Sequence, residues 1–351
     1  MRIGLDATPL LGARTGVGRY ALSLLTALTA YDDQLVATAF TFRGRDQLRP
    51  PPGVRVAARP APARALQELW ARGEWPPVEL LSGNVDVFHA TNFVLPPLRR
   101  ARGVVTIHDL SYLHQPETVS TASARYRALV PRSLERAAAV VTPSATTAEL
   151  VRAEYDVQVP VVVTPLGVDP GWFDAAPPDD ALRTELGLPS TYLVFVGTLE
   201  PRKDLRTLVD AHRLMVDAPP LVLVGPPGWG EQVDVRGCIT TGYLEDERLR
   251  AVVAGAAALV LPSRDEGFGI PVLEALAAGT PVVASDLPVL REVGGTVTTY
   301  AEPGGPASFA AALEQVLDEP GDRQLRRAHA SAFTWGRCAE RTREAYLLAL
   351  G

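Results

Sequence analysis

Residues 262–285 read PSRDEGFGIPVLEALAAGTPVVAS, and this stretch sets the interpretation of the whole chain. It follows an apolar run that predicts a buried strand. Pro271 is typical of the first turn of a helix and Gly279 of the position that ends one, which predicts a helix over Val272–Ala278. The next apolar run, Val282–Ala284, predicts a second strand. Strands that are apolar on both faces and joined by a helix indicate a parallel sheet.

The same alternation of apolar runs and helical segments extends over the chain in both directions. The other predicted strands are Arg2–Asp6, Leu35–Thr41, Val54–Ala58, Val85–His89, Val104–His108, Val140–Thr142, Tyr192–Val196, Leu221–Val224 and Ala257–Leu261. The pattern restarts after a turn-rich connector, Val161–Pro178. We therefore expect an α/β chain with two doubly wound, Rossmann-like domains, residues 1–167 and 168–333, which face each other across a cleft.

Length and composition agree with a globular protein of about two domains, because the chain has 351 residues of which 47% are hydrophobic. The two cysteines, Cys238 and Cys338, lack CxxC spacing, which indicates ordinary thiols in a reducing compartment. The longest apolar run, Ala251–Pro262, is shorter than the ~20 residues that a membrane-spanning helix needs. We therefore expect a cytoplasmic protein.

Charge is distributed unevenly along the chain. Residues 1–150 contain 17 arginines against 12 acidic residues, although the whole chain has a net charge of −6. A basic first half is suited to an anionic acceptor or to peripheral contact with the inner face of the cytoplasmic membrane. A solvated, arginine-rich surface is the alternative, and both stay open. We expect no nucleic-acid partner.

Two glutamates flank the glycine-rich turn of the opening stretch. Gly267 and Gly269 permit a ligand to approach the backbone, and the helix that follows presents free N–H groups. We place Glu274 in the first turn of that helix, so its side chain and that of Glu266 should point toward one pocket. Carboxylates accept hydrogen bonds from paired hydroxyl groups of sugar and ribose. For each glutamate taken alone, a purely structural role is the alternative to ligand binding. The two glutamates together favour a binding site.

The only lysine of the chain is Lys203, although the chain has 34 basic residues. It lies in Val194–His212, VFVGTLEPRKDLRTLVDAH, where a buried strand ends at Gly197 and a helix begins near Asp204. Together with Arg202, this lysine is placed to stabilise the charge of a departing diphosphate. A basic surface loop is the alternative, which the single use of lysine argues against.

Three further segments supply weaker candidates. Gly225 ends a strand and Tyr243 follows a glycine, where it would border a base, although ordinary loops would explain both. The segment Arg14–Tyr20, RTGVGRY, forms a predicted glycine loop without full GxGxxG spacing, so a nicotinamide oxidoreductase is poorly supported. His108 and Asp109 end a strand, where they would orient a substrate or relay a proton, with a structural histidine as the alternative.

The residues Glu266–Glu274, EGFGIPVLE, match the E-x7-E motif of retaining glycosyltransferase family 4, the group 1 enzymes of GT-B fold. The resemblance covers nearly the whole chain, and the segments GTLEPRK and GVGRY are similar to those of bacterial mannosyltransferases that build O-antigen and related polysaccharides. It implies that a final helix, residues 334–351, crosses back to the first domain. Many relatives have arginine at the position of Thr198, and Arg202 is the candidate replacement.

The resemblance also implies a role for each candidate residue. Glu266 with the backbone of Gly267–Ile270 would hold the donor sugar, and Glu274 would bind the ribose. Lys203 and Arg202 would neutralise the diphosphate, Gly16 would lie near it, and His108 would face the transferred sugar. The full set of expected donor-binding residues is Gly16, Gly18, Gly197, Thr198, Gly225, Tyr243, Gly267, Phe268, Gly269, Ile270 and Glu274.

The implied reaction is transfer of a hexose, with retention and without a metal, from a nucleotide-diphosphate sugar to a saccharide or a lipid-linked acceptor. The donor implied is GDP-mannose, with UDP-sugars as the alternative. The chain contains no DxD, HExxH, CxxC or GxxxxGK[ST] motif, so we expect neither a catalytic metal nor another cofactor. A nucleotide-sugar epimerase and a non-catalytic nucleotide-sugar-binding protein remain the alternatives.

Overall fold

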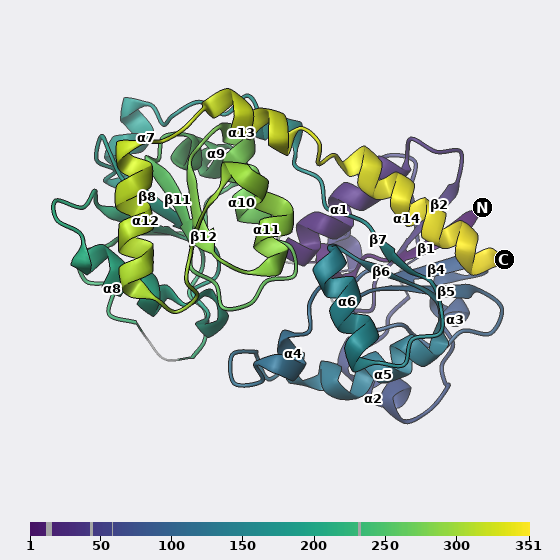
Figure 1. Cartoon of the computed structure of the whole chain (residues 1–351). Coiled ribbons are helices and arrows are strands. Elements are labelled where there is room, and N and C mark those ends of the chain that lie inside the picture. The colour runs from purple at the N-terminus through teal and green to yellow at the C-terminus, as the bar shows by residue number, and fades with distance from the viewer. Residues whose placement is uncertain (12–15, 43–44, 58, 231–232) are drawn as a thin grey trace. The chain divides into compact units, whose positions relative to one another are not determined.

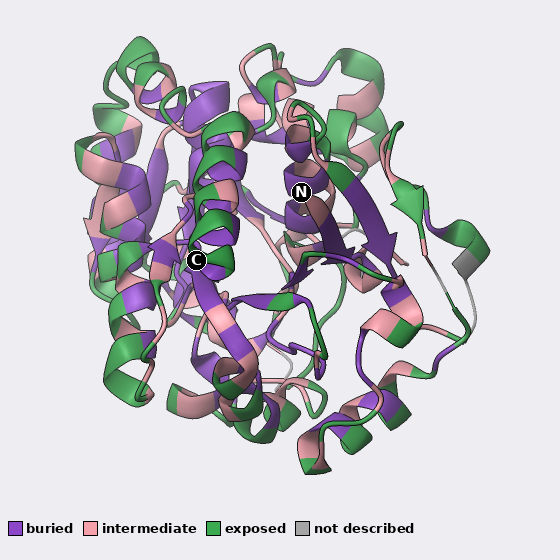
Figure 2. Ribbon diagram, turned by 90° about the vertical axis from the view of Figure 1, so that its right-hand side faces the viewer, coloured by how far each residue is buried: buried purple, intermediate pink, exposed green. Residues whose placement is uncertain are grey.

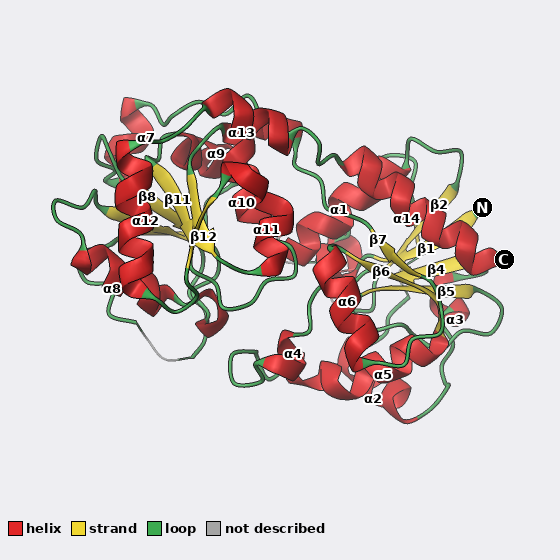
Figure 3. Cartoon of the chain, in the orientation of Figure 1, coloured by secondary structure: helices red, strands yellow, loops and turns green. Residues whose placement is uncertain are grey.

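The computed structural model describes residues 1–11, 16–42, 45–57, 59–230 and 233–351. Contacts divide the chain into two compact units (Figure 1). Unit 1 comprises residues 1–114, 121–167 and 334–351, and unit 2 comprises residues 115–120 and 168–333. Each unit is built on one parallel sheet, which confirms the predicted α/β fold with two doubly wound sheets (Figure 3).

Unit 1 contains a seven-stranded sheet in the order β3-β2-β1-β4-β5-β6-β7. The strands are β1 Arg2–Asp6, β2 Gln34–Thr38, β3 Arg55–Val56, β4 Val87–Ala90, β5 Arg102–Thr106, β6 Ala137–Thr142 and β7 Val161–Val163. The helices are α1 Gly16–Leu28, α2 Ala63–Arg72, α3 Glu79–Ser82, α4 Ser111–His114, α5 Tyr126–Arg136, α6 Ala145–Glu154 and α14 Trp335–Leu350. The direction of winding reverses between β1 and β4, and open α/β sheets bind ligands beyond the carboxyl ends of the strands at such a point.

Unit 2 contains a six-stranded sheet in the order β10-β9-β8-β11-β12-β13. The strands are β8 Leu193–Val196, β9 Leu221–Val224, β10 Ile239–Gly242, β11 Ala258–Leu261, β12 Val282–Ser285 and β13 Thr299–Ala301. The helices are α7 Asp180–Leu186, α8 Leu205–Leu214, α9 Asp246–Ala254, α10 Ile270–Ala278, α11 Pro288–Gly294, α12 Pro306–Asp318 and α13 Arg323–Ala330. The reversal of winding lies between β8 and β11.

The central strands are buried because their residues are apolar on both faces. In β9 and β11 every residue is buried, and Figure 2 shows most strands in the colour of buried residues. Helix α14 contributes one face to the core of unit 1, where it packs on α1 and on β4–β7. Within the described ranges, no helix combines the length and the apolar content that a membrane crossing requires.

Each predicted strand overlaps an observed one, although Ala58 of the predicted Val54–Ala58 lies outside the described residues, and three observed strands were not predicted. One of them, β7, lies at the start of the segment interpreted as a connector, Val161–Pro178, and has only three residues. The others, β10 and β13, lie at the two edges of the sheet of unit 2, and β10 contains no buried residue. Short edge strands carry little of the apolar pattern that reveals a central strand.

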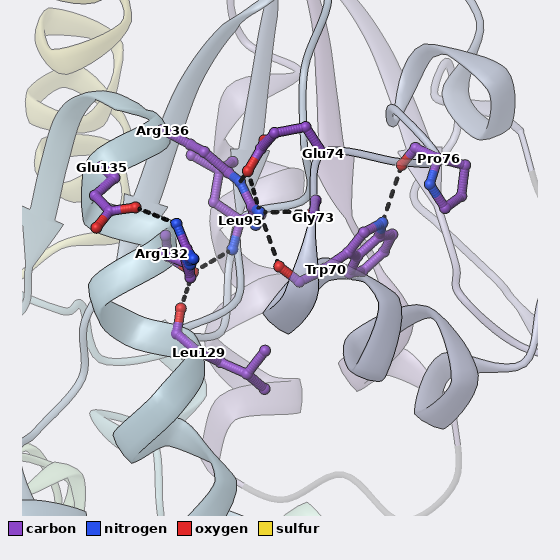
Figure 4. Close-up of polar contacts among 10 residues, drawn as sticks. Trp70, Gly73, Glu74, Pro76, Leu95, Leu129, Arg132, Glu135 and Arg136 are labelled. Carbon is purple, nitrogen blue, oxygen red and sulfur yellow. Dashed lines mark hydrogen bonds and ion pairs between the residues drawn. The ribbon is translucent and has the colours of Figure 1, made fainter.

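Arg136, the last residue of α5, joins three segments of unit 1 (Figure 4). Its guanidinium group donates to both carboxylate oxygens of Glu74, at 2.9 and 2.7 Å. It also donates to the main-chain oxygens of Trp70 at 2.8 Å, Gly73 at 3.1 Å and Leu95 at 3.2 Å. One side chain thereby satisfies carbonyl groups at the end of α2 and in the loop after β4.

Candidate functional site

The loops after β8 and β9 lie against each other at the carboxyl edge of the sheet of unit 2. Gly197 follows β8 and donates its N–H to the carbonyl oxygen of Val224 at 2.9 Å. A Cβ on Gly225 would lie 2.0 Å from the carbonyl oxygen of Gly197, so no side chain fits there. The structure thus gives this glycine a packing reason, in addition to the donor-binding role that the sequence predicted.

The segment after Gly197 turns once and then enters α8. Pro201–Lys203 form a single 3-10 turn, and Asp204 adopts φ 47° before the helix begins. The Asp204 carboxylate accepts hydrogen bonds from the backbone N–H of Thr207 at 3.4 Å and from its hydroxyl at 2.8 Å. Asp204 is therefore the N-cap, as predicted, and it also pairs with Arg264 at 2.8 Å.

Four charged side chains meet at the carboxyl ends of β8 and β11. The ammonium of Lys203 lies 2.6 Å from Oε1 of Glu266, and Arg202 lies 3.4 Å from Oε2. Arg202 also pairs with Glu200 at 2.8 Å, and the hydroxyl of Ser263 donates to Glu266 at 2.7 Å. We call Glu200, Arg202, Lys203 and Glu266 the charge cluster.

The charge of Glu266 is stabilised within this cluster although the residue is only 9% exposed. Burial alone would raise the pKa of its carboxyl group. Attraction to Lys203 and Arg202, with hydrogen bonds from Lys203 and Ser263, outweighs burial and holds that pKa below its usual value. The cluster therefore presents two basic side chains beside a carboxylate that stays ionised near neutral pH.

Helix α10 begins two residues earlier than expected, which corrects the predicted position of Glu274. Gly269 is the N-cap at φ 97°, and the helix starts at Ile270, so Glu274 lies in the second turn. Its side chain is buried, with 5% exposure. Gly279 ends the helix at φ 83°, as predicted.

The aromatic residue of the glycine-rich turn belongs to the core of unit 2. The ring of Phe268 is buried and packs against Phe333, with ring centroids 6.1 Å apart. Its contribution to a ligand site is therefore limited to its backbone. Gly269 adopts φ 97°, a backbone conformation that favours glycine, and a Cβ there would also press on the side chain of Leu290 at 2.5 Å.

Other donor-site candidates lie at the same edge of the sheet. Thr198 follows β8, and Tyr243 follows β10 with half of its surface exposed. The donor-site candidates of unit 2 therefore lie together at the carboxyl ends of β8–β11. Among the residues described, no group of three or more His, Cys, Asp or Glu side chains is arranged to hold a metal ion.

The glycine segment of unit 1 differs from its prediction as a loop. Gly16 and Gly18 lie inside α1, whereas Arg14 and Thr15 of the same motif lie outside the described residues. A Cβ on Gly18 would lie 2.7 Å from the carbonyl oxygen of Pro9. Close approach of the two backbone segments explains that glycine, whereas no atom of the described residues lies within 4 Å of a Cβ placed on Gly16.

His108 lies beyond the carboxyl end of β5 in a defined tautomer. Its Nε2 lies 2.8 Å from the carbonyl oxygen of Thr91, so Nε2 carries a proton and donates it. Burial lowers the pKa of His108, which leaves Nδ1 as a hydrogen-bond acceptor at neutral pH. Asp109 accepts instead from the backbone N–H of Ser111 at 3.1 Å, so the structure does not join the two side chains as a proton relay.

Two buried titratable residues of unit 1 were not singled out from the sequence. Asp6 ends β1, and burial raises its pKa to about 6. His89 lies within β4, hydrogen-bonded to Tyr346 and to Thr106 at 2.7 Å each. Both residues could have been recognised in the sequence, because each is a titratable residue inside an apolar run, which is unusual for a strand buried on both faces.

The chain matches two family models over most of its length. The model for Glycosyl transferases group 1 matches residues 190–319, which contain the charge cluster and α10. The model for Glycosyltransferase Family 4 matches residues 14–172, which contain His108.

Individual proteins show the same similarity. O-antigen chain mannosyltransferase B of Escherichia coli is 32% identical over 283 residues, which cover 75% of this chain and 74% of that protein. The 2-deoxystreptamine glucosyltransferase of Streptomyces kanamyceticus is 31% identical over 284 residues, with 74% and 73% covered. The solved structure of HepE from Anabaena, in complex with UDP-glucose, matches with a TM-score of 0.70 at 19% identity, and 98% of each chain is covered.

Proposed function

Because the chain belongs to family 4 of the glycosyltransferases, the group 1 enzymes, we propose that it transfers a hexose, with retention, from a nucleotide-diphosphate sugar to a saccharide or lipid-linked acceptor. The observation that carries this proposal is the charge cluster, where Lys203 and Glu266 meet at 2.6 Å. Mannose is the preferred sugar because the Escherichia coli relative is named a mannosyltransferase. A nucleotide-sugar donor agrees with the Anabaena structure, whose ligand is UDP-glucose.

The charge cluster suggests how a donor would be recognised. An arriving diphosphate would accept hydrogen bonds from Lys203 and Arg202, which now pair with Glu266. That exchange would leave the oxygens of Glu266 available to accept from hydroxyl groups of the sugar. The same residues would then bind both halves of the donor, and the two cations would replace a metal ion as the partner of the phosphate charge.

Bond breaking would use the same two cations. As the bond between the anomeric carbon and the phosphate oxygen breaks, charge develops on the departing diphosphate, where Lys203 and Arg202 stabilise it. The acceptor hydroxyl would form its new bond on the face that the diphosphate leaves, and its proton would pass to a phosphate oxygen. This course retains the configuration of the anomeric carbon.

Two further residues would position the donor. Glu274 would accept from the two ribose hydroxyls through its buried carboxylate. His108 would accept from a hydroxyl of the transferred sugar through Nδ1, since Nε2 already donates to Thr91. Both roles depend on neutral hydrogen-bonding groups of the donor, so their removal should weaken affinity without abolishing the reaction.

Thermal-shift binding tests the donor site directly. Wild-type protein would be measured with GDP-mannose, UDP-glucose, UDP-N-acetylglucosamine, GDP and UDP. Ligand at a hundred times its Kd should add ~2.7 kcal/mol to the free energy of unfolding. We expect one nucleotide sugar to stabilise the wild type and Glu314→Gln, whose exposed carboxylate on α12 serves as control, and to stabilise Glu274→Ala much less. Absence of stabilisation by every nucleotide sugar would contradict the proposal.

A further inference from the structure

We propose that Tyr20 is a positioning residue for the transfer reaction, which fixes the ring plane of His108 so that Nδ1 of this histidine keeps one direction. This inference rests on the proposed function, in which His108 accepts a hydrogen bond from the transferred sugar through Nδ1. It gives a role to the last residue of the motif RTGVGRY, which neither the predicted glycine loop nor the donor site explains.

Tyr20 contacts His108 ring against ring inside unit 1. It lies at the start of the second turn of α1, and its side chain is buried. The two ring centroids are 5.0 Å apart, with ring planes at 86°. Phe93, in the loop after β4, makes a similar contact with His108 at 5.5 Å and 74°. The imidazole therefore has favourable, nearly perpendicular ring contacts from two separate segments of the chain.

These contacts are needed because the hydrogen bond of His108 does not fix its ring plane. Nε2 donates to the carbonyl oxygen of Thr91 at 2.8 Å. Nε2 lies close to the axis of the torsion between Cβ and the ring, so a bond at Nε2 constrains this torsion weakly. The torsion is also intrinsically broad for histidine. The neighbouring rings must therefore set the direction in which Nδ1 points.

A chain of buried hydrogen bonds holds Tyr20 in place. Its hydroxyl lies 2.9 Å from the hydroxyl of Thr106, which in turn lies 2.7 Å from Nε2 of His89. Nδ1 of His89 lies 2.7 Å from the hydroxyl of Tyr346 on α14. Residues of α1, β5, β4 and α14 are thereby joined, and all four are buried. We call Tyr20, Thr106, His89 and Tyr346 the anchoring chain.

The members of the anchoring chain stay uncharged near neutral pH. Burial raises the pKa of Tyr20 and that of Tyr346 well above their usual value, and it lowers the pKa of His89 to about 3. Neutral hydroxyl and imidazole groups both donate and accept, so the three hydrogen bonds can run in one direction and strengthen one another. A connected polar chain of this kind holds Tyr20 in a single position.

The anchoring chain and His108 share one segment of backbone. Thr106 ends β5, and the N–H of Ile107 bonds to the carbonyl oxygen of Val141 at 2.9 Å, so the backbone stays paired up to His108. Side chains two residues apart in an extended segment point to the same face of the sheet. The hydroxyl that anchors Tyr20 and the imidazole that its ring contacts are therefore held in a fixed relation.

Packing alone does not require a tyrosine at this position. The other large buried side chains of α1 belong to Leu24, Leu25 and Leu28, which serve the core without hydrogen bonds. Burying a hydroxyl group costs free energy unless it is paired. The phenol and its partners therefore occur where α1 contacts His108, as expected of a positioning residue.

The test is a double-mutant cycle between Tyr20 and His108. Tyr20→Leu removes the ring, Tyr20→Phe keeps it, and each is combined with His108→Ala. Calorimetric titration would measure binding of the nucleotide sugar that stabilises the wild type and of its free nucleoside diphosphate. We expect Tyr20→Leu to weaken binding of the nucleotide sugar by roughly 5–10-fold, the loss typical of one hydrogen bond, and binding of the free nucleoside diphosphate to stay unchanged.

The other variants distinguish positioning from packing. Tyr20→Phe should bind the nucleotide sugar almost as the wild type does, because the ring remains and Thr106 keeps its bond to His89. In the His108→Ala background, Tyr20→Leu should cause no further loss. An equal loss with and without the His108 imidazole would show that the two residues act independently and would overturn the proposal. A loss in Tyr20→Phe as large as in Tyr20→Leu would overturn it too.

Phe88→Leu is the matched control for loss of a buried ring in the same sheet. Phe88 lies in β4 and packs on Phe40, with ring centroids 6.3 Å apart. We expect Phe88→Leu to lower Tm as Tyr20→Leu does, but to bind the nucleotide sugar like the wild type. If Phe88→Leu lost as much affinity as Tyr20→Leu, general weakening of the core would explain both, and the proposal would be wrong.

NMR relaxation tests the positioning without any donor. With ¹³C-labelled histidine, the ring C–H groups of His108 would be assigned by comparison with His108→Ala. We expect their order parameters to be high in the wild type and in Tyr20→Phe, and lower in Tyr20→Leu, because the ring is then free to turn. Equal order in all three proteins would overturn the proposal. Failure of the proposed function would differ, since the wild type would then bind no nucleotide sugar.

Discussion

The ammonium of Lys203 lies 2.6 Å from the carboxylate of Glu266, which joins the loop after β8 to the loop after β11. Both residues are only 9% exposed, so the pair is formed largely out of contact with water. A buried ion pair of this kind is weak evidence for stability, because desolvation offsets much of the attraction. Its position at the carboxyl edge of a parallel sheet makes it evidence for binding instead.

Replacing Lys203 with arginine should abolish most of the activity even though the charge is kept. The planar guanidinium cannot occupy the space of a compact ammonium that already touches Glu266. We expect kcat/KM to fall by roughly 10²–10³, the loss typical of one removed donor to developing charge. Steady-state kinetics would measure it, with Arg248→Lys, at an exposed pair with Glu185, as the control. Activity within a few-fold of wild type in Lys203→Arg would contradict this role.

Donor binding should also protect Lys203 from chemical modification. The chain has two amines, the α-amino group of Met1 and the ammonium of Lys203. The first pairs with Asp33 in unit 1 at 2.7 Å, so it serves as an internal control. We expect the nucleotide sugar to slow reductive methylation of Lys203, followed by mass spectrometry, while the rate at Met1 stays constant. Equal rates with and without donor would show that the ammonium is not at the donor site.

Glu266→Gln should separate binding of the nucleotide from binding of the sugar. Removing this carboxylate takes away the anionic partner of Lys203, leaves Arg202 paired with Glu200, and removes repulsion from the diphosphate. The variant should therefore bind the free nucleoside diphosphate at least as tightly as wild type, yet bind the nucleotide sugar about tenfold more weakly. Calorimetric titration of both ligands would measure this. Parallel losses for the two ligands would indicate damage to the fold rather than loss of a sugar contact.

The sequence was informative where a residue type is required by its position. Gly279 ends α10 at positive φ and Asp204 caps α8, as their residue types predicted, and the apolar runs located all the central strands. The start of α10 was predicted two residues too late, at Val272, because Gly269 is the N-cap and Ile270 is already helical, with Pro271 as the second residue of the helix. That difference moved Glu274 from the first turn to the second.

Side-chain partners were beyond the reach of the sequence. Lys203 and Glu266 were recognised separately, but 63 residues separate them, and spacing gives no sign of their contact. Likewise, His108 and Asp109 are adjacent in sequence yet bond to Thr91 and Ser111, respectively. Such pairings depend on which strands become neighbours, a property of the topology of the sheet rather than of any local pattern.

Removal of divalent metal should leave the transferase active. In the proposed reaction, Lys203 and Arg202 supply the positive charge that a metal would otherwise place on the diphosphate. We expect the rate after dialysis against EDTA to match the untreated rate within twofold, and added Mg²⁺ or Mn²⁺ to change it little. A loss of activity in EDTA that Mg²⁺ or Mn²⁺ restores would show that the two side chains are insufficient.

Acid should destabilise unit 1 through His89. This residue is fully buried, and Nδ1 and Nε2 lie 2.7 Å from the hydroxyls of Tyr346 on α14 and Thr106 on β5. Burial lowers its pKa from 6.5 to about 3. Its neutral form therefore contributes stability above pH 6.5, and this stability is lost as the pH falls toward 3, because the unfolded chain takes up the proton first.

The expected size of that loss can be measured. Between pH 6.5 and pH 5, His89 should account for about 2 kcal/mol of the free energy of unfolding. His89→Gln keeps hydrogen-bonding groups near Tyr346 and Thr106 but cannot be protonated. Urea unfolding at the two pH values should therefore show a smaller acid-induced loss in the variant than in the wild type, although the variant is less stable at pH 7. Equal losses in the two proteins would show that His89 does not control the acid sensitivity.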